Sequence, residues 1–437
     1  MDRISDLSDD LLLKIVSSLP TKNVVATMLL SKRWRFIWTM LPSLDFDYGS
    51  DSEIEPSEYG KFIKYVDRTM VLNRAPVLET LKFKVGPCYG SEDLGTWIRI
   101  GMVRGVLELE TVQDYEFDDS IELPMTLYTY EKLEVLKLTR AIVVDVPDDV
   151  WFPSLKTLHL VSVKYKTKET HRKLLPGCPV LEDLVLDKTL NGFDVGSIYV
   201  DVPSLQRLSI LDTYEEANQG DPAVGLCMIV MNVPSLKYLN FVDTFGDLCL
   251  CENMPEVVEA NVRVVYEDPK KLLESIPSVK RLYLCLSASL ETIKQFVSQH
   301  RVGFHHLLHL ELCGGCEGWW DLLTWMLESS PKLQRNNGFY EGISRIKGQW
   351  RGPTSVPGCL MFHLHTFKWE DYESKDQEKR ILTYILKNAR QLTTADISSW
   401  RSYSGDLNEL VSLPRASSSC QLMVNGEKLV AACSNKI

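Results

Sequence analysis

The chain has 437 residues, a formal net charge of -11, and the balance of apolar and charged residues of an ordinary globular protein. Its longest apolar run, residues 224–231, is too short to cross a bilayer, and no apolar segment follows Met1, so we expect neither a membrane anchor nor a secretory signal. The eleven cysteines then predict reduced thiols in the cytoplasm or nucleus, and the lack of a basic stripe argues against nucleic-acid binding.

Residues 1–47 predict a small module of three short helices. Ser8 stands at the N-cap of the first helix, and Thr21 and Ser31 are expected to cap the second and third. The apolar residues of the first helix recur at helical spacing until Pro20, at Leu11, Leu12, Ile15 and Leu19. The apolar residues outnumber the interior positions of so small a module, which indicates docking on a partner.

This stretch resembles the plant form of the F-box, through the segments DRIS, DDLLLKI, LPTK, VVAT and LSKRWR. The resemblance implies a Skp-type adaptor as partner and, through it, a cullin–RING ubiquitin ligase. The family usually has proline where this chain has Ser8, which implies a looser entry into the first helix and weaker adaptor binding. The alternative is an ordinary helical cap on a repeat array. Carried over by position, the adaptor-binding residues are Leu7, Leu11, Leu12, Ile15, Leu19, Pro20, Leu30 and Trp34.

A helical linker is predicted for residues 48–75, and about ten irregular units of the form Leu-x-x-Leu-x-Leu follow over residues 76–335. Successive units lie at the spacing of leucine-rich repeats. The last two leucines of a unit alternate with period two, so both face the core from one short strand, and stacked units form a parallel sheet. The predicted fold class is therefore α/β, with an N-terminal three-helix F-box followed by an irregular leucine-rich-repeat solenoid.

The repeat pattern is interrupted over residues 336–355, which predict an irregular loop on the interaction face or a gap in the array. Residues 356–424 resemble the plant FBD domain, through VPGCL, YILKNAR and LPRASSSCQL, and residues 425–437 are expected to be a tail. The order of the three parts is similar to that of the plant F-box/FBD/leucine-rich-repeat protein family. Within the FBD segment, residues 376–389 predict an amphipathic helix with these residues inside: Ile381, Leu382, Ile385 and Leu386.

Histidines and cysteines between residues 305 and 316 form the one cluster with a metal-like spacing: His305, His306, His309, Cys313 and Cys316. The leucines between them fit a repeat strand, however, and a strand sends alternate side chains to opposite faces. We therefore expect no metal site. Neither a Gly-rich phosphate loop nor a Gly-x-Ser-x-Gly motif occurs, so we expect no cofactor and no catalytic residue.

The favoured hypothesis is a non-catalytic substrate-recognition subunit of an SCF-type (Skp–cullin–F-box) ubiquitin ligase. The F-box binds the adaptor, and the repeats with the FBD segment recruit an unknown target protein for ubiquitination. One alternative is a non-ligase interaction protein with a degenerate F-box. Another is a small-molecule receptor within a ligase, which the acidic middle of the chain disfavours.

Overall fold

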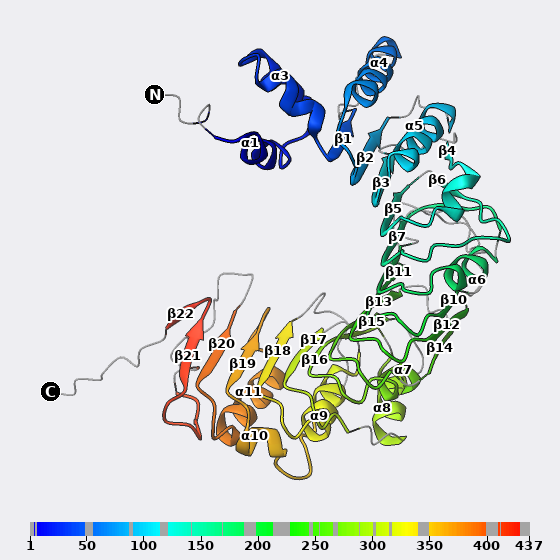
Figure 1. The fold of residues 1–437 in the computed structure, drawn as a ribbon. Coiled ribbons are helices and arrows are strands. Elements are labelled where there is room, and N and C mark those ends of the chain that lie inside the picture. Colours follow the sequence, from blue (N-terminus) through cyan, green and yellow to red (C-terminus); the bar gives the residue numbers. More distant parts are fainter. Residues whose placement is uncertain are drawn as a thin grey trace. The chain divides into compact units, whose positions relative to one another are not determined.

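The computed structural model describes residues 4, 7–48, 56–86, 91–113, 121–140, 142–167, 169–187, 198–212, 228–243, 248–252, 254–264, 270–287, 289–299, 303–313, 317–339, 349–398, 410 and 412–428. The chain forms two compact units, Met1–Val230 and Met231–Ile437, which are described in turn (Figure 1).

Unit 1 begins with a helical module whose segments are α1 (Asp9–Val16), α2 (Thr21–Ala26), the 3-10 helix η1 (Thr27–Leu29), α3 (Trp34–Ile37) and the 3-10 helix η2 (Trp38–Met40). Ser8 occupies the N-cap position, but its side chain makes no capping hydrogen bond. The two other predicted caps are wrong. Thr21 is the first residue of α2, where its hydroxyl accepts a hydrogen bond from the N–H of Asp45 instead of capping the helix, and Arg33, not Ser31, precedes α3.

The rest of unit 1 is a parallel sheet whose strands pair in chain order, with α4, α5 and α6 beside it (Figure 1). The strands are β1 (Ser43–Asp47), β2 (Thr80–Val85), β3 (Glu108–Gln113), β5 (Val135–Thr139), β7 (Thr157–Val161), β9 (Asp183–Asp187) and β11 (Arg207–Asp212). The helices are α4 (Pro56–Leu72), α5 (Ser91–Val103), η3 (Met125–Thr129), α6 (Thr170–Leu174) and η4 (Leu175–Gly177). Further short strands are β4 (Ile121–Glu122), β6 (Ile142–Val144), β8 (Lys164–Tyr165), β10 (Ile198–Asp201) and β12 (Met228–Asn232).

Unit 2 repeats this plan, with a parallel sheet that carries α7 to α11 on one face (Figure 1). Its paired strands are β13 (Tyr238–Asp243), β15 (Glu259–Val264), β16 (Arg281–Leu286), β17 (His309–Cys313), β18 (Arg335–Phe339), β19 (Thr366–Trp369), β20 (Thr394–Ile397), β21 (Gln421–Val424) and β22 (Glu427–Lys428). A further strand is β14 (Leu248–Cys251). The helices are α7 (Lys270–Glu274), α8 (Leu290–Gln299), α9 (Trp319–Ser329), α10 (Gly358–Phe362) and α11 (Asp376–Asn388).

The predicted period-two pattern is confirmed in the strands. In β5, for example, Leu136 and Leu138 are buried, and Leu133 from the preceding turn is buried beneath them. The weaker units predicted near Val106 and Val257 form β3 and β15. Each strand lies beside the next with its leucines in register. One continuous apolar layer therefore covers the buried face of each sheet.

The predicted irregular loop at 336–355 is wrong at its start, because residues 335–339 form β18 within the sheet. Its two inward positions are Asn336 and Gly338 instead of leucines. A Cβ added at Gly338 would lie 3.4 Å from Cζ2 of Trp319, so the indole fills the space that a leucine occupies elsewhere. Residues 340–348 lie outside the described residues.

The C-terminal segment closes the sheet of unit 2. Helix α11 buries the four residues predicted for its inner face, Ile381, Leu382, Ile385 and Leu386. Asn425 and Gly426 both have positive φ and join β21 to the antiparallel strand β22, which is the geometry of an Asn-Gly hairpin turn. The predicted tail at 425–437 therefore begins inside a hairpin, and its residues 429–437 lie outside the described residues.

Candidate functional site

The N-terminal module separates its apolar residues into an interior and an exposed group. Leu12 is fully buried and Trp34 is 7% exposed, so these two predicted adaptor-binding residues lie in the interior, at the contact of α1 with α3. Leu7 is half-buried. The other predicted residues are exposed, namely Leu11, Ile15, Leu19, Pro20 and Leu30.

The exposed group also contains apolar residues of the helices that the sequence analysis did not select, namely Met28, Leu29, Phe36 and Met40, and Ile4 before α1 is exposed as well. Leu29 is 86% exposed and Phe36 is 67% exposed, and it is the number of such residues in one small module that is informative. Phe36 and Met40 are four residues apart, and this spacing was the signal that could have found them. We name the nine exposed residues of both groups the docking face: Leu11, Ile15, Leu19, Pro20, Met28, Leu29, Leu30, Phe36 and Met40.

Arg33 fixes the entry of the chain into α1. Its guanidinium lies 2.7 Å from the Asp9 carboxylate and donates a hydrogen bond to the carbonyl of Leu7. These contacts hold the start of α1, where the Ser8 side chain contributes no cap.

Thr21 connects the helical module to the sheet of unit 1. Its hydroxyl accepts a hydrogen bond of 2.7 Å from the backbone N–H of Asp45 in β1, and its side chain is buried. Because β1 pairs with β2 on its other side, this contact satisfies an N–H at the edge of the sheet. The docking face and the first repeat strands are thus parts of one packed body.

The polar positions of the strands form a second surface, which we call the outer strand face. In unit 1 several charges on this face are neutralised by partners one strand away. Burial, the largest influence, raises the pKa of Asp45 in the same face, and the positive charge of Lys82 opposes that rise. The neutralised pairs are Lys82–Glu110 at 3.1 Å and Arg207–Asp183 at 3.3 Å, and Lys156–Glu134 at 2.8 Å joins the residues just before β7 and β5.

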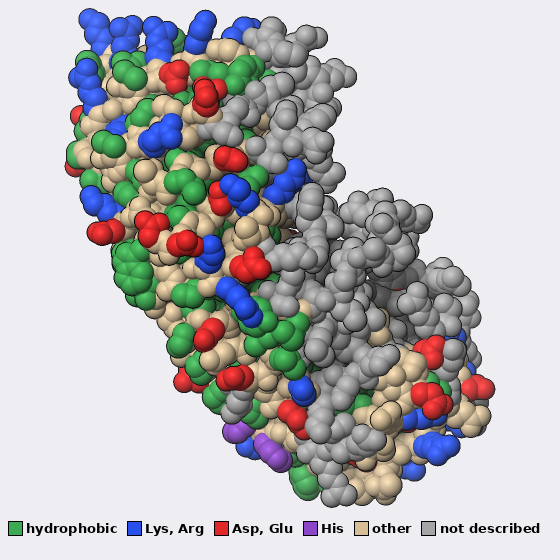
Figure 2. All heavy atoms as spheres, turned by 90° about the vertical axis from the view of Figure 1, so that its right-hand side faces the viewer, with side chains coloured by type: hydrophobic (Ala, Val, Ile, Leu, Met, Phe, Trp, Pro, Cys, Tyr) green, Lys and Arg blue, Asp and Glu red, His purple; other side chains and the backbone are tan. Residues whose placement is uncertain are grey.

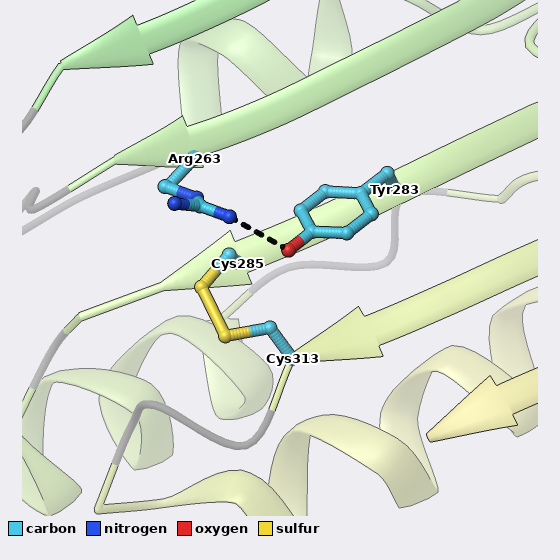
Figure 3. The surroundings of a disulfide bond; sticks show 4 residues. All are labelled: Arg263, Tyr283, Cys285 and Cys313. Carbon is cyan, nitrogen blue, oxygen red and sulfur yellow. Dashed lines mark hydrogen bonds between the residues drawn. A yellow bond between two sulfur atoms is a disulfide. The ribbon is translucent and has the colours of Figure 1, made fainter. Parts of the chain in front are cut away.

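In unit 2 the outer strand face carries the four residues that Figure 3 shows as sticks. Arg263 on β15 donates a hydrogen bond of 3.1 Å to the hydroxyl of Tyr283 on β16. Beside them Cys285 on β16 and Cys313 on β17 form a disulfide. The expectation of reduced thiols is wrong for this pair, because the register of β16 and β17 brings together two cysteines that are 28 residues apart in sequence.

The histidine and cysteine cluster between residues 305 and 316 lies only partly within the described residues. Cys313 is bonded to Cys285, while Cys316 lies outside the described residues. His305 and His306 are exposed in the turn before β17. In the part of the chain that the structure describes, no group of three histidine, cysteine, aspartate or glutamate side chains could hold a metal ion.

The surface shown in Figure 2 carries charges of both signs, interspersed with hydrophobic side chains. Lys and Arg side chains gather along its upper edge, at the height of α3 and α4 in Figure 1. No helix among the described residues is both long and apolar enough to cross a membrane.

Comparison with known proteins finds three domain models along this chain. The F-box domain model matches residues 4–46, a model of the LRR repeats of an FBD-associated F-box protein matches residues 94–248, and the FBD model matches residues 352–397. A putative FBD-associated F-box protein of Arabidopsis thaliana is 57% identical over 97% of this chain and 100% of its own length. The chain belongs to the F-box/FBD/LRR-repeat family.

Two further Arabidopsis thaliana members of the F-box/FBD/LRR-repeat family are 43% and 39% identical to this chain. Each match covers 97% of this chain and at least 98% of the relative. The docking face lies within the F-box match, and β18 lies between the LRR and FBD matches. Proteins of the F-box/LRR type are typically non-catalytic, and an F-box implies binding to a Skp-type adaptor.

Proposed function

We propose that this chain is the substrate-recognition subunit of an SCF-type ubiquitin ligase. The docking face supports this proposal, because it gathers nine exposed, mostly large apolar residues on a module of about 35 residues. In the proposed complex the docking face binds a Skp-type adaptor, which joins it to a cullin–RING ligase. The outer strand face then holds a target protein at a fixed position relative to the ligase. The chemical step takes place on other subunits, and this chain contributes proximity and orientation.

The proposal assigns the adaptor contact to the exposed residues of the module. Leu12 and Trp34 act from the interior, by fixing α1 against α3, while Leu29, Leu30 and Phe36 meet the adaptor directly. Burying a large aliphatic or aromatic side chain in an interface contributes about 1.5–3 kcal/mol. A charge placed there therefore opposes binding strongly.

The test is co-expression of the full chain with a Skp-type adaptor, followed by pull-down and gel filtration. We expect a stoichiometric complex, and its loss in Leu30→Asp. A matched control is Val103→Asp, because Val103 is 89% exposed at the end of α5 and lies outside the docking face. Equal adaptor binding by both variants would contradict the assignment of the docking face.

One observation favours the degenerate F-box as a second candidate. The Ser8 side chain makes no capping hydrogen bond at the start of α1. This candidate predicts that the unaltered chain forms no adaptor complex and that Ser8→Pro restores one. Complex formation by the unaltered chain rules this candidate out.

A further inference from the structure

The backbone pairing between β16 and β17 stops short of the ends of these strands. The last paired residues of the two strands are Leu284 and Leu312. On its other side β16 stays paired with β15 as far as Leu286, and β17 stays paired with β18 as far as Cys313. At the carboxyl ends of these described strands, the sheet therefore has a line between β16 and β17 that backbone pairing does not cross. We call this line the seam.

The disulfide bond crosses the seam. Cys285 and Cys313 lie one residue beyond the last paired residues, and their Cα atoms are 4.7 Å apart. Because side chains alternate along a strand, the two cysteines follow Tyr283 and Glu311 on the outer strand face, although both are buried. Figure 3 shows the disulfide beside the hydrogen bond from Arg263 to Tyr283. A change at the seam therefore acts on the surface that is proposed to hold a target protein.

The disulfide also closes a ring of chain that contains α8. The two cysteines are 28 residues apart in sequence, and α8 lies between them. Helix α8 packs on α9, where the rings of Phe296 and Trp325 lie 4.9 Å apart. A cross-link over a loop of this length stabilises the folded state mainly by restricting the unfolded chain. Reduction of the bond therefore lowers the stability of unit 2.

Two other buried cysteines are held as thiols. Burial raises the pKa of Cys178 and of Cys359 to about 12, and each thiol donates a hydrogen bond to a backbone carbonyl. A thiol with so high a pKa forms little thiolate, which is the form that reacts with a disulfide. Cys285 and Cys313 differ because they lie at strand ends, and strand ends open at a lower free energy than the middle of a sheet.

We propose that Cys285 and Cys313 form a redox switch that closes the seam when oxidised and releases it when reduced. The reaction is thiol–disulfide exchange with glutathione. In the oxidising direction the two cysteine thiols give two electrons and two protons to glutathione disulfide. The bond between Cys285 and Cys313 forms, the S–S bond of glutathione disulfide breaks, and two glutathione thiols leave. The reverse reaction restores two cysteine thiols. Because unbonded sulfur atoms cannot lie as close together as bonded ones, the ends of β16 and β17 then move apart.

The first test follows the cysteines themselves. The full chain is equilibrated in buffers of rising ratio of glutathione disulfide to glutathione, quenched with acid, alkylated and analysed by peptide mass spectrometry. We expect one transition in which Cys285 and Cys313 change together, while Cys178 and Cys359 stay thiols throughout. A pair that stays oxidised in excess dithiothreitol until the chain unfolds would be a permanent cross-link, and a pair that glutathione disulfide does not oxidise would be two inert thiols. Either result overturns the proposal.

The second test measures what reduction does to the seam. Hydrogen exchange of the unaltered chain is compared between the oxidised and the reduced state. We expect exchange at the carboxyl ends of β16 and β17 to be about tenfold faster after reduction, and exchange in β2 and β3 of unit 1 to stay the same. We also expect the melting temperature of unit 2 to fall by about 5–10 °C, because the cross-linked loop is lost. Unchanged exchange at the seam would overturn the proposal, whatever the melting temperature does.

Two variants locate the switch. Cys285→Ser combined with Cys313→Ser should behave like the reduced chain in every glutathione buffer, whereas Cys251→Ser, at a half-buried cysteine of β14, should keep the full response. A double variant that still responds to glutathione would overturn the assignment. Reduction of the unaltered chain needs no substitution, so a double variant that fails to fold leaves the first two tests decisive. The switch lies in unit 2 and does not rest on adaptor binding, so its failure leaves the proposed function unaffected.

Discussion

Asn336 is a buried polar residue where the neighbouring strands carry apolar side chains. It is in register with Leu310 and Phe367 and is 1% exposed. Neither its amide nitrogen nor its amide oxygen has a hydrogen-bond partner among the described residues. An unsatisfied buried polar group costs about 1–3 kcal/mol, so β18 is a weak point of the sheet.

We predict that Asn336→Leu stabilises unit 2 by about 1–3 kcal/mol, because it removes the unsatisfied amide and restores the leucine of the repeat. Thermal and urea unfolding measure the effect. The control is Asn337→Leu on the outer strand face, which loses the hydrogen bond to Glu311 and should not stabilise. A lower melting temperature for Asn336→Leu than for the unaltered chain would contradict the packing described for β18.

Ser8 precedes α1, and replacing it by proline tests how the start of this helix is stabilised. Its φ of -63° already matches the fixed φ of proline, and its side chain makes no capping hydrogen bond. We predict that Ser8→Pro stabilises the helical module by about 0.4–1 kcal/mol, since proline restricts the unfolded chain. Unfolding of the full chain followed by tryptophan fluorescence measures this change. The control is Ser18→Pro, inside the turn that ends α1, which should destabilise.

At the scale of elements, the link between α2 and β1 decides how rigidly the docking face is joined to the repeats. Thr21→Val keeps the shape of the side chain but removes the acceptor for the Asp45 N–H. We predict a loss of about 1 kcal/mol of stability and faster proteolysis between α2 and β1, because a partly buried N–H loses its acceptor. The control is Thr39→Val, because the exposed Thr39 hydroxyl donates its hydrogen bond to the carbonyl of Phe36, three residues earlier in the chain. Equal proteolysis of the two variants would count against the link.

The Trp319, Trp369 and Tyr372 cluster shows how neighbouring elements compensate for the missing leucines of β18. The Trp319 and Trp369 rings lie 5.7 Å apart, and the Trp369 and Tyr372 rings lie 5.8 Å apart. All three residues are buried. Large aromatic rings from α9 and from the FBD segment thus fill the volume beside Gly338, which keeps β18 in the sheet.

At the scale of the whole molecule, sheets built from stacked strands must protect their terminal edges. In unit 1 α2 covers an N–H of β1, and in unit 2 the short antiparallel strand β22 follows β21. We predict that a chain ending at residue 398 aggregates, because it exposes the edge of β20. Gel filtration with light scattering tests this. The control chain ends at residue 428 and keeps the hairpin, and an equally monodisperse 398-residue chain would contradict the prediction.

The sequence by itself determined the order of the parts and the type of those elements that have a regular apolar period. The period of two in the repeat strands and the period of 3.6 in α11 are local patterns, and local patterns are readable in one chain. The caps of α2 and α3 and the strand β18 were not predicted correctly. Leu11, Ile15, Leu19 and Leu30, which the F-box resemblance assigns to the adaptor contact, are exposed in the structure, and their role stays a prediction. Leu12 and Trp34 could not be told apart from them, because burial depends on how α1 packs against α3.

Only the tertiary structure decided which distant residues meet. Cys285 and Cys313, and likewise Gly338 and Trp319, come from different repeats. The register of the strands brings the first pair together, and the packing of α9 on the sheet brings the second pair together. Register is fixed by the burial of every leucine in the sheet at once, which is a property of the packed array and of no single repeat.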